Sequence, residues 1–240
     1  MQEPMDILPS LNQQAEWPPG WRILPNGASI ACEVIDAWRT IPVAVAGDCM
    51  GRSIGATGLR QYHPDLATVM CGRAVTVRTR PGDNLVIHKA MLMANPGDVI
   101  VIDAGGSVEQ AIVGGLMRTT AIARKLGGFI VDGAVRDLLE WQEGGMPCFA
   151  RGHTHRGPSK DGPGAVNIPI SCGGLVVQPG DLILGDADGI LAIPANELSG
   201  LMPKVQEHLE REAAIRETNA QEGGNADRIN ALLRSKGLNI

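Results

Sequence analysis

Hydrophobic positions repeat with two different periods along the chain, and each change of period marks a change of secondary structure. From residue 31 to residue 60 the apolar side chains, Cys32 to Trp38 first among them, follow helical spacing, with a break at Ile41-Pro42. The segment 70–80, MCGRAVTVRTR, alternates instead with the period of two that is typical of an extended chain. The pattern therefore predicts helices first and then a strand.

A Pro-Gly-Asp phrase occurs three times, at 81–83, 96–98 and 179–181. The last two copies each precede a β-rich run, VIVIDAGG and LILGDADGILAIP. Pro-Gly suits the central pair of a type II turn, because glycine takes the positive φ there. We interpret the three phrases as turns, the last two leading into strands.

Two internal helices are predicted at 114–128, GGLMRTTAIARKLGG, and at 134–145, AVRDLLEWQEGG, each ending in a glycine pair. The second follows an apolar run that ends at Asp132-Gly133, and a charged helix is expected at 201–220. The order of elements predicts an α/β fold with a large β component. We divide the chain into an N-terminal arm (1–30), an α/β domain (31–200) and a C-terminal helix with a tail (201–240).

Composition narrows the class of protein. The formal net charge is −5, from 21 basic and 26 acidic residues, and aromatic residues make up 3%. Neither a basic patch nor base-stacking platforms are expected, so nucleic acid is excluded as a partner. The five cysteines are scattered without a CxxC pair, which predicts reduced, buried thiols. Without a signal peptide or a run of about 18 apolar residues, we expect no membrane contact and a cytoplasmic location.

Candidate chemistry gathers where the two internal helices begin. The backbone of Gly114, Gly115, Leu116 and Met117 could wrap a small anion, because helix N-termini expose unpaired N–H groups. In the second helix, Arg136 offers a fork for a carboxylate, and Asp137 offers the oxygen ligand that Mg²⁺ or Mn²⁺ prefers.

The alternative is an ordinary solvated first turn. Arg136 and Glu140 are four residues apart and could form a surface ion pair, while Asp137 would interact with the helix dipole. The pattern alone favours this surface turn.

Other motifs carry weaker signals. GRSIG at 51–55 matches the G-x-S-x-G nucleophile elbow through Ser53, but a helix end rather than a strand precedes it. His153 and His155 would share one face of a strand, and no third metal ligand stands at a suitable spacing. We place both histidines on the surface or at a pocket rim, and read RGPSKDGPG at 156–164 as a mobile polar loop.

Several long motifs nevertheless resemble one family. GGLMRTTAIARKLGGFIVDGAVRDLLEW, PCFARGHTHRGP, GPGAVNIPISCGGLVVQPGDLILGDADGILAIP and PGDNLVIHKAMLMANPGDVIVIDAGG are similar to the RraA-like family of 4-hydroxy-4-methyl-2-oxoglutarate aldolases and the regulator of ribonuclease activity A. The resemblance covers about residues 40–195. It implies a three-layer β/β/α sandwich of the swivelling-domain type, assembled as trimers or dimers of trimers with sites near subunit interfaces.

The resemblance also implies residue roles, and it reverses the preference for a surface turn. Arg136 would bind the pyruvyl group, Asp137 would hold a divalent cation (Mg²⁺ or Mn²⁺) largely through water, and the Gly114–Met117 backbone would bind the substrate carboxylate. Glu140 matches a position where members with aldolase activity carry an acid. Many members have Glu or Asp where this chain has Gly115.

The missing acid leaves three candidates open. Asp83, Asp103 or Glu212 from a neighbouring subunit's C-terminal helix could replace it. Our leading hypothesis is a metal-dependent lyase that cleaves a 4-hydroxy-2-oxo acid to pyruvate, with oxaloacetate decarboxylation as a further activity. The alternative is a non-catalytic regulator that binds a ribonuclease E-type protein.

Overall fold

The computed structural model describes residues 18–240, so the first 17 residues of the expected N-terminal arm lie outside the described part. The helices are α1 (Cys32–Trp38), α2 (Val43–Cys49), α3 (Leu85–Met93), α4 (Gly115–Ala123), α5 (Leu138–Gln142), α6 (Leu198–Glu222) and α7 (Ala226–Ser235). The strands are β1 (Arg22–Ile23), β2 (Arg60–Gln61), β3 (Met70–Thr79), β4 (Val99–Asp103), β5 (Ala111–Val113), β6 (Gly128–Val135), β7 (Cys148–His153), β8 (Gly164–Val166), β9 (Ile170–Cys172), β10 (Leu175–Val177), β11 (Leu182–Asp186) and β12 (Gly189–Ile193).

A mixed sheet forms the centre of the fold. Its strand order is β1-β8-β3-β4-β6-β7-β2, and the four central strands β3, β4, β6 and β7 run parallel. The hairpin β11–β12 joins through the first half of β3, and β5 pairs with the end of β6. Parallel strands are buried on both faces, which explains the nearly continuous apolar runs in β4 and β6.

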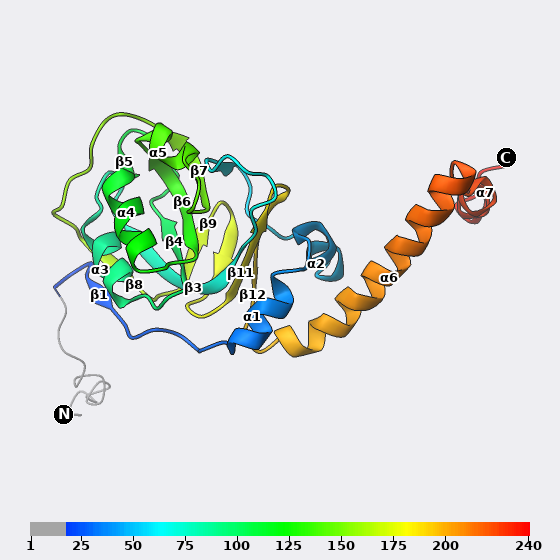
Figure 1. The fold of residues 1–240 in the computed structure, drawn as a ribbon, viewed down its shortest axis with the longest axis horizontal. Helices are drawn as coiled ribbons and strands as arrows, with labels where there is room; N and C mark the ends of the chain where they lie inside the picture. Colours follow the sequence, from blue (N-terminus) through cyan, green and yellow to red (C-terminus); the bar gives the residue numbers. More distant parts are fainter. Residues whose placement is uncertain (1–17) are drawn as a thin grey trace, which may run out of the picture.

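Layers cover the sheet on both sides (Figure 1). Helices α3, α4 and α5 pack on one face around a core that contains Phe129, Ile102 and Trp141. The opposite face packs Val101 and Ile130 against β9, β10 and the β11–β12 hairpin. A third cluster joins the outside of that hairpin to α1, α2 and the first turns of α6. The predicted α/β class and layered β/β/α architecture are confirmed.

The strand and turn predictions are confirmed at the positions that matter for the site. The strand predicted in 70–80 is β3, and the Pro-Gly-Asp phrases lead into β4 and β11. Gly82, Gly97 and Gly180 all have positive φ, as type II-like turns require. Helix α3 follows the first phrase and was not predicted. Ser53 lies in a turn after α2 and not between a strand and a helix, so the nucleophile-elbow geometry is absent there.

The helix predicted at 134–145 begins later than expected. Strand β6 continues through Val135, because Ala134 and Val135 pair with Gly152 and His153 of β7. All eight residues of β6 are buried, so the sheet overrides the helical pattern. Helix α5 is only five residues long, and Arg136 and Asp137 form the turn before it.

Cysteine burial is predicted only in part. All five cysteines are unpaired, and Cys71, Cys148 and Cys172 are buried, but Cys32 is exposed at the start of α1. Burial raises the pKa of the Cys71 thiol to about 11. Within residues 18–240, no helix combines the length and the apolar character needed to cross a lipid bilayer.

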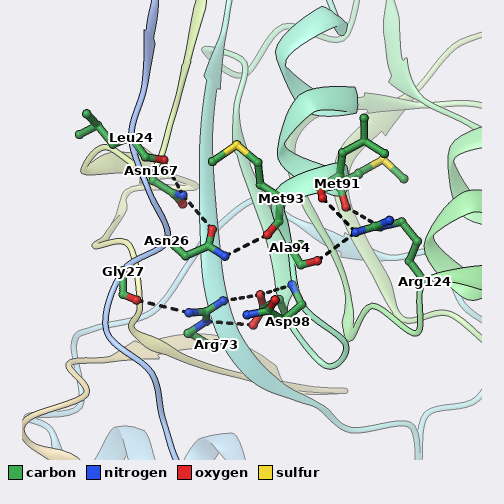
Figure 2. Close-up of polar contacts among 12 residues, drawn as sticks. Leu24, Asn26, Gly27, Arg73, Met91, Met93, Ala94, Asp98, Arg124 and Asn167 are labelled. Carbon is green, nitrogen blue, oxygen red and sulfur yellow. Dashed lines mark hydrogen bonds and ion pairs between the residues drawn. The ribbon is translucent and has the colours of Figure 1, made fainter.

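A buried ion pair fastens the N-terminal segment to the sheet (Figure 2). Arg73 Nε donates to Asp98 Oδ1 at 2.9 Å, and Arg73 also donates to the carbonyl of Gly27. Asn26 is held between the carbonyl of Met93 and the side chain of Asn167. Both members of the ion pair are less than 10% exposed, so water cannot replace a lost partner.

We therefore expect Asp98→Ala to lower the free energy of unfolding by about 3–5 kcal/mol, because it leaves the Arg73 guanidinium buried and unpaired. The matched control is Asp36→Ala, which removes an ion pair with Arg39 whose carboxylate is 74% exposed. Its effect should stay within about 0.5 kcal/mol. Urea denaturation measures both, and equal effects would contradict a desolvated Arg73–Asp98 pair.

Candidate functional site

The predicted site residues meet where the β5–α4 and β6–α5 connections lie side by side. Strands β5 and β6 are parallel neighbours, so the residues that follow them emerge at the same edge of the sheet. The amide of Arg136 donates to the carbonyl of Val113 at 3.0 Å. One turn further, the amide of Gly115 donates to Asp137 Oδ2 at 2.8 Å. The structure thus brings the residues predicted at 114–117 against Arg136 and Asp137.

Asp137 has a left-handed backbone, with φ 62° and ψ 49°. Few residues other than glycine adopt this region, and Asp and Asn tolerate it best. The indole N–H of Trp141 donates to the Arg136 carbonyl at 2.8 Å and stabilises the turn. Arg136 Nε lies 3.5 Å from Asp137 Oδ2, and both side chains are more than a third exposed. Arg136 therefore pairs with the adjacent Asp137. It does not pair with Glu140, which was the partner in the surface-turn alternative.

Glycine at the two positions where α4 begins leaves room for the side chains of Arg136, Asp137 and Glu140. A Cβ on Gly114 would lie 2.6 Å from Asp137 Oδ2 and 2.9 Å from Arg136 Cγ. A Cβ on Gly115 would coincide with the Glu140 carboxylate. Glu140 therefore fills the space in which a side chain at 115 would begin.

Two of the three alternatives for the missing acid are engaged elsewhere in the chain, and Glu212 of a neighbouring subunit stays a prediction. Asp83 is fully buried and accepts four hydrogen bonds, and Asp103 Oδ1 accepts from the Gly105 amide. Glu212 lies on α6 and pairs with Arg216. Within one described chain, the acid beside Gly115 is Glu140.

The backbone amides of the 114–117 turn are not equivalent. Asp137 occupies the Gly115 amide, and Met117 donates to the Gly114 carbonyl. The amides of Gly114 and Leu116 have no acceptor among the described residues, so these two remain to bind an anion. Of the four amides predicted to bind a carboxylate, only those of Gly114 and Leu116 remain available.

A small cavity of about 80 Å³ opens on the Arg136 side of this turn. Its polar lining includes Arg136, Asn84, His88 and Lys160, and the Gly114 and Leu116 backbone completes it. Lys160 Nζ donates to Asn84 Oδ1 at 3.2 Å and has no carboxylate partner within the described chain. Two cations therefore face one small cavity, an arrangement suited to an anion with two charged groups.

His88 contributes a further polar group to the cavity. Its Nε2 is buried and has no hydrogen-bond partner in the part of the chain described. Burial, together with the nearby Lys160 ammonium, lowers the pKa of the His88 imidazole below its usual value. An uncharged imidazole adds a polar ring to the cavity lining without a third positive charge.

Lys160 reaches the cavity because Asp83 holds the loop that carries it. Asp83 Oδ2 accepts from Ser159 Oγ at 2.7 Å, from the Asp161 amide at 2.6 Å and from the Gly162 amide at 3.0 Å. Burial alone would raise the pKa of Asp83, but these bonds, with one from the Leu85 amide, lower it below its usual range. The predicted mobile loop at 156–164 is instead anchored at its centre. The sequence pattern does not indicate Asn84 or Lys160 as site residues, because only the folded loop brings Lys160 to the cavity. Asp83-Asn84 does stand at the first Pro-Gly-Asp phrase, but that phrase predicts only a turn.

The donor set fits a hard divalent cation. Asp137 Oδ1 and both oxygens of Glu140 accept no hydrogen bond among the described residues. Mg²⁺ is commonly held by one or two carboxylates and keeps several waters. Asp137 Oδ2 accepts from the Gly115 amide, and the Glu140 carboxylate lies next to the Gly115 Cα, so these two residues would supply the carboxylates.

A second group of ligand-type side chains, Asp48, His208 and Glu212, fits a cation poorly. Arg211 donates to His208 Nδ1 at 2.7 Å, which leaves the imidazole proton on Nε2, the atom nearest the carboxylates. Arg52 and Arg216 pair with the two acids. This network joins α2 to α6.

The remaining sequence candidates lie apart from the cavity lining. His153 ends β7, where its Nδ1 is 3.2 Å from the Tyr62 hydroxyl, and His155 is exposed in the following loop. Ser53 is exposed, and the hydrogen bonds of the described histidines all involve other partners.

Known proteins share this fold and much of the sequence. The family model described as "RraA-like: Aldolase/RraA" matches residues 31–192. A protein of Halalkalibacterium halodurans named "Putative 4-hydroxy-4-methyl-2-oxoglutarate aldolase" is 41% identical over 176 residues, which cover 72% of this chain and 82% of that relative. A Thermus thermophilus protein named 4-hydroxy-4-methyl-2-oxoglutarate aldolase is 35% identical over 51% of this chain and 74% of its own length.

Solved structures extend the likeness. The RNA-processing inhibitor RraA from Thermus thermophilis aligns with a TM-score of 0.54 at 31% identity, covering 58% of this chain and 83% of that one. An uncharacterized Pseudomonas syringae protein aligns with a TM-score of 0.71 at 24% identity, covering 82% and 96%, which speaks for the fold alone. The matched region includes the β5–α4 and β6–α5 connections that build the site. The chain therefore belongs to the RraA-like family.

Proposed function

We propose that the protein is a divalent-metal-dependent lyase that cleaves a 4-hydroxy-2-oxo acid, such as 4-hydroxy-4-methyl-2-oxoglutarate, to pyruvate. The observation that carries the proposal is a cation-lined cavity next to two carboxylates beside Gly115, of which Asp137 keeps Oδ1 and Glu140 keeps both oxygens without a hydrogen bond among the described residues. The names of the relatives from Halalkalibacterium and Thermus support the same reaction. Oxaloacetate decarboxylation is proposed as a further activity, since it also passes through pyruvate enolate.

Substrate binding uses the cationic side of the turn. The C1 carboxylate lies against Arg136 and the free amides of Gly114 and Leu116. The second carboxylate of a 4-hydroxy-2-oxoglutarate lies toward Lys160, at the other end of the cavity. The cavity is small, which favours short, branched oxo acids over long ones.

Cleavage breaks the C3–C4 bond. The bonding electron pair stays with C3 and becomes pyruvate enolate, the C4 hydroxyl loses its proton as C4 becomes a carbonyl, and C3 then takes up a proton. The Arg136 guanidinium lies beside the oxygen on which the enolate charge develops and stabilises it. Asp137 and Glu140 would hold Mg²⁺ or Mn²⁺, which when bound supplies Lewis-acid polarisation of the 2-oxo group.

Two exposed leucines support a homo-oligomer, which we propose to be a trimer or hexamer. Leu116 in the first turn of α4 and Leu139 in α5 are 82% and 86% exposed, and they flank the site. Large apolar side chains grouped beside a polar site are typical of surfaces covered by another subunit. A neighbouring chain would then close the cavity against water.

The direct test supplies oxaloacetate or 4-hydroxy-4-methyl-2-oxoglutarate with Mg²⁺ or Mn²⁺ and follows pyruvate. The alternative, a regulator that binds a ribonuclease E-type protein, is favoured by the likeness to the solved RNA-processing inhibitor. A pull-down with a ribonuclease E scaffold region separates the two. Binding without metal-dependent pyruvate release from any branched 4-hydroxy-2-oxo acid would reject the lyase.

Substitutions at Arg136 and at Asp137 should lower the activity in different ways. Arg136→Ala should lower kcat by about 10²–10³-fold, as expected for the loss of a group that binds the developing charge, and added metal should not restore it. Arg136→Lys should recover little, because lysine lacks the bidentate fork.

Asp137→Asn should stay folded, because asparagine tolerates the left-handed backbone and its amide oxygen can still accept from Gly115. It should bind the cation more weakly and regain part of its rate at high Mg²⁺ or Mn²⁺. Steady-state kinetics over a metal titration measures this difference. Wild-type rates in both the Arg136 and the Asp137 variants would show that this turn is a solvated surface feature and not part of a catalytic site.

The position of Glu140 predicts a compensating pair of substitutions. Gly115→Asp should abolish activity, because the new side chain meets the Glu140 carboxylate in both space and charge. Gly115→Asp with Glu140→Gly should recover metal-dependent activity well above either single variant, since the acid then projects from α4. Additive losses in this double-mutant cycle would show that the two positions do not share one carboxylate.

Lys160 should control the affinity for the distal carboxylate. Lys160→Met should raise KM for 4-hydroxy-4-methyl-2-oxoglutarate by about 10–100-fold, the value of one charge-assisted hydrogen bond. Inhibition by pyruvate, which lacks the second carboxylate, should change little. Lys89→Met is the matched control, because Lys89 is exposed on α3. Equal weakening of both ligands would assign Lys160 to the C1 carboxylate instead.

A further inference from the structure

Helix α4 sends one arginine to the C-terminal end of α5 and another to the C-terminal end of α3. Arg118 Nη2 donates to the carbonyl of Gly144, in the turn that ends α5, at 2.6 Å. Arg124 Nε donates to the carbonyl of Met91 at 2.8 Å, and its Nη2 donates to that of Ala94 at 3.3 Å (Figure 2). A cation at this end of a helix satisfies free carbonyls and interacts favourably with the helix dipole. Both arginines therefore cap a helix other than their own.

The Arg118 guanidinium is buried and has few partners. Its side chain is 9% exposed, and Nε is buried without a hydrogen-bond partner among the described residues. Glu143 Oε2 lies 3.4 Å from Arg118 Nη1, but the Glu143 side chain is 65% exposed, so water screens this ion pair. The short bond to the Gly144 carbonyl is therefore the main interaction of the buried charge.

Helix α5 depends on contacts at both of its ends. It has five residues, whereas isolated helices shorter than about 12–15 residues are marginal in water. The Trp141 indole holds its beginning through the Arg136 carbonyl, and Arg118 holds its end. Gly144 and Gly145, with φ 77° and 76°, then turn the chain away from the helix. Loss of the Arg118 contact would leave the end of α5 free to shift.

The same two helices meet at the candidate metal site, one turn earlier. Arg118 lies three residues after Gly115, and Gly144 lies four residues after Glu140, so each step is about one helical turn. At this earlier contact there is no spare room, because a Cβ on Gly115 would coincide with the Glu140 carboxylate. A shift of α5 would therefore move the Glu140 carboxylate relative to the Gly115 backbone.

We propose that Arg118 is a positioning residue for the metal site. By capping α5 from α4, it holds the Glu140 carboxylate where that group can bind a divalent cation together with Asp137. The inference rests on the proposed function, because it takes Glu140 as a metal ligand. Arg118 does not line the cavity, so its effect passes through α5. Removal of residues that orient metal ligands typically weakens metal binding by about 10–100-fold.

Mn²⁺ binding to the full chain, measured by isothermal titration calorimetry, tests the proposal. Arg118→Met keeps an unbranched apolar stem without the guanidinium, and it should raise the Mn²⁺ dissociation constant by about 10-fold or more. Arg118→Lys should recover part of the affinity, because its ammonium can still donate to one carbonyl. Hydrogen exchange without metal should show faster exchange of the Glu143 and Gly144 amides in Arg118→Met, since these amides close the last turn of α5.

Arg124→Met is the matched control. It removes the same kind of bond from the same helix, but α3 carries neither Asp137 nor Glu140. Its Mn²⁺ affinity should therefore stay within about 2-fold of the wild-type value. Equal losses in the Arg118 and Arg124 variants would overturn the inference and assign the loss to a general weakening of α4.

Two variants at glutamates locate the effect. Glu143→Gln should leave the Mn²⁺ affinity almost unchanged, because the Arg118–Glu143 pair is mostly exposed at its acidic end. A loss as large as in Arg118→Met would overturn the carbonyl cap as the cause. In a Glu140→Gln background, Arg118→Met should lower the affinity no further, because its effect passes through that carboxylate. Additive losses would overturn this route.

The outcomes separate this inference from the proposed function. A wild-type dissociation constant for Mn²⁺ in Arg118→Met would overturn the role of Arg118 and leave the lyase proposal standing. No Mn²⁺ binding by the wild-type chain would overturn the metal dependence of the lyase, and the positioning role of Arg118 with it.

Discussion

The candidate site depends on how closely the backbone at the start of α4 approaches the turn that follows β6. The approach brings the Gly115 amide within 2.8 Å of Asp137 Oδ2, and a Cβ at position 114 would lie only 2.6 Å from that same oxygen. The bond also holds Asp137 in its left-handed conformation, which aims Arg136 into the cavity. Two glycines thus set the positions of one cation and two carboxylates.

This arrangement leaves most charged groups of the site without an opposite charge: Arg136 pairs with Asp137, while Lys160 and Glu140 form no ion pair among the described residues. Arg136 and Lys160 face the cavity, while the carboxylates of Asp137 and Glu140 gather around Gly115. In the proposed function, a 2-oxo acid would meet cations at its carboxylate and a metal held by Asp137 and Glu140 at its oxo group. Salt would weaken a purely surface arrangement of this kind, but partial burial in the cavity reduces the screening.

Asp83 positions another part of the site by anchoring the loop that carries Lys160. Its carboxylate is fully buried and accepts four hydrogen bonds, three of them from the loop that carries Lys160. Because these bonds hold the pKa of Asp83 low, their stabilising effect is present above the usual carboxyl pKa and is lost as the pH falls through the lowered value. The loop position, and with it the second cation, is therefore built into the fold at neutral pH.

Local periodicity and glycine placement predict the α/β class, the strand-initiating turns and the adjacent Arg136 and Asp137, whereas the layered architecture is implied by the family resemblance. The sequence does not predict that β6 runs through Val135, since the pairing with His153 is a contact between distant strands. Nor does local pattern reveal Lys160, which looks like part of a polar loop until Asp83 is seen to hold it. Contacts of long sequence separation decide both points.

The surroundings of Glu140 in the structure change the interpretation of this residue. From the sequence it is the fourth residue after Arg136 and suggests a surface ion pair, or it matches an acid in a resembling family. In the structure it pairs with no cation among the described residues and fills the space next to Gly115. A carboxylate left without a cationic partner in a partly buried position is costly unless something positive binds there. In the proposed lyase, a divalent cation held by Glu140 and Asp137 would supply that positive charge, whereas a pure protein-binding module offers no such partner.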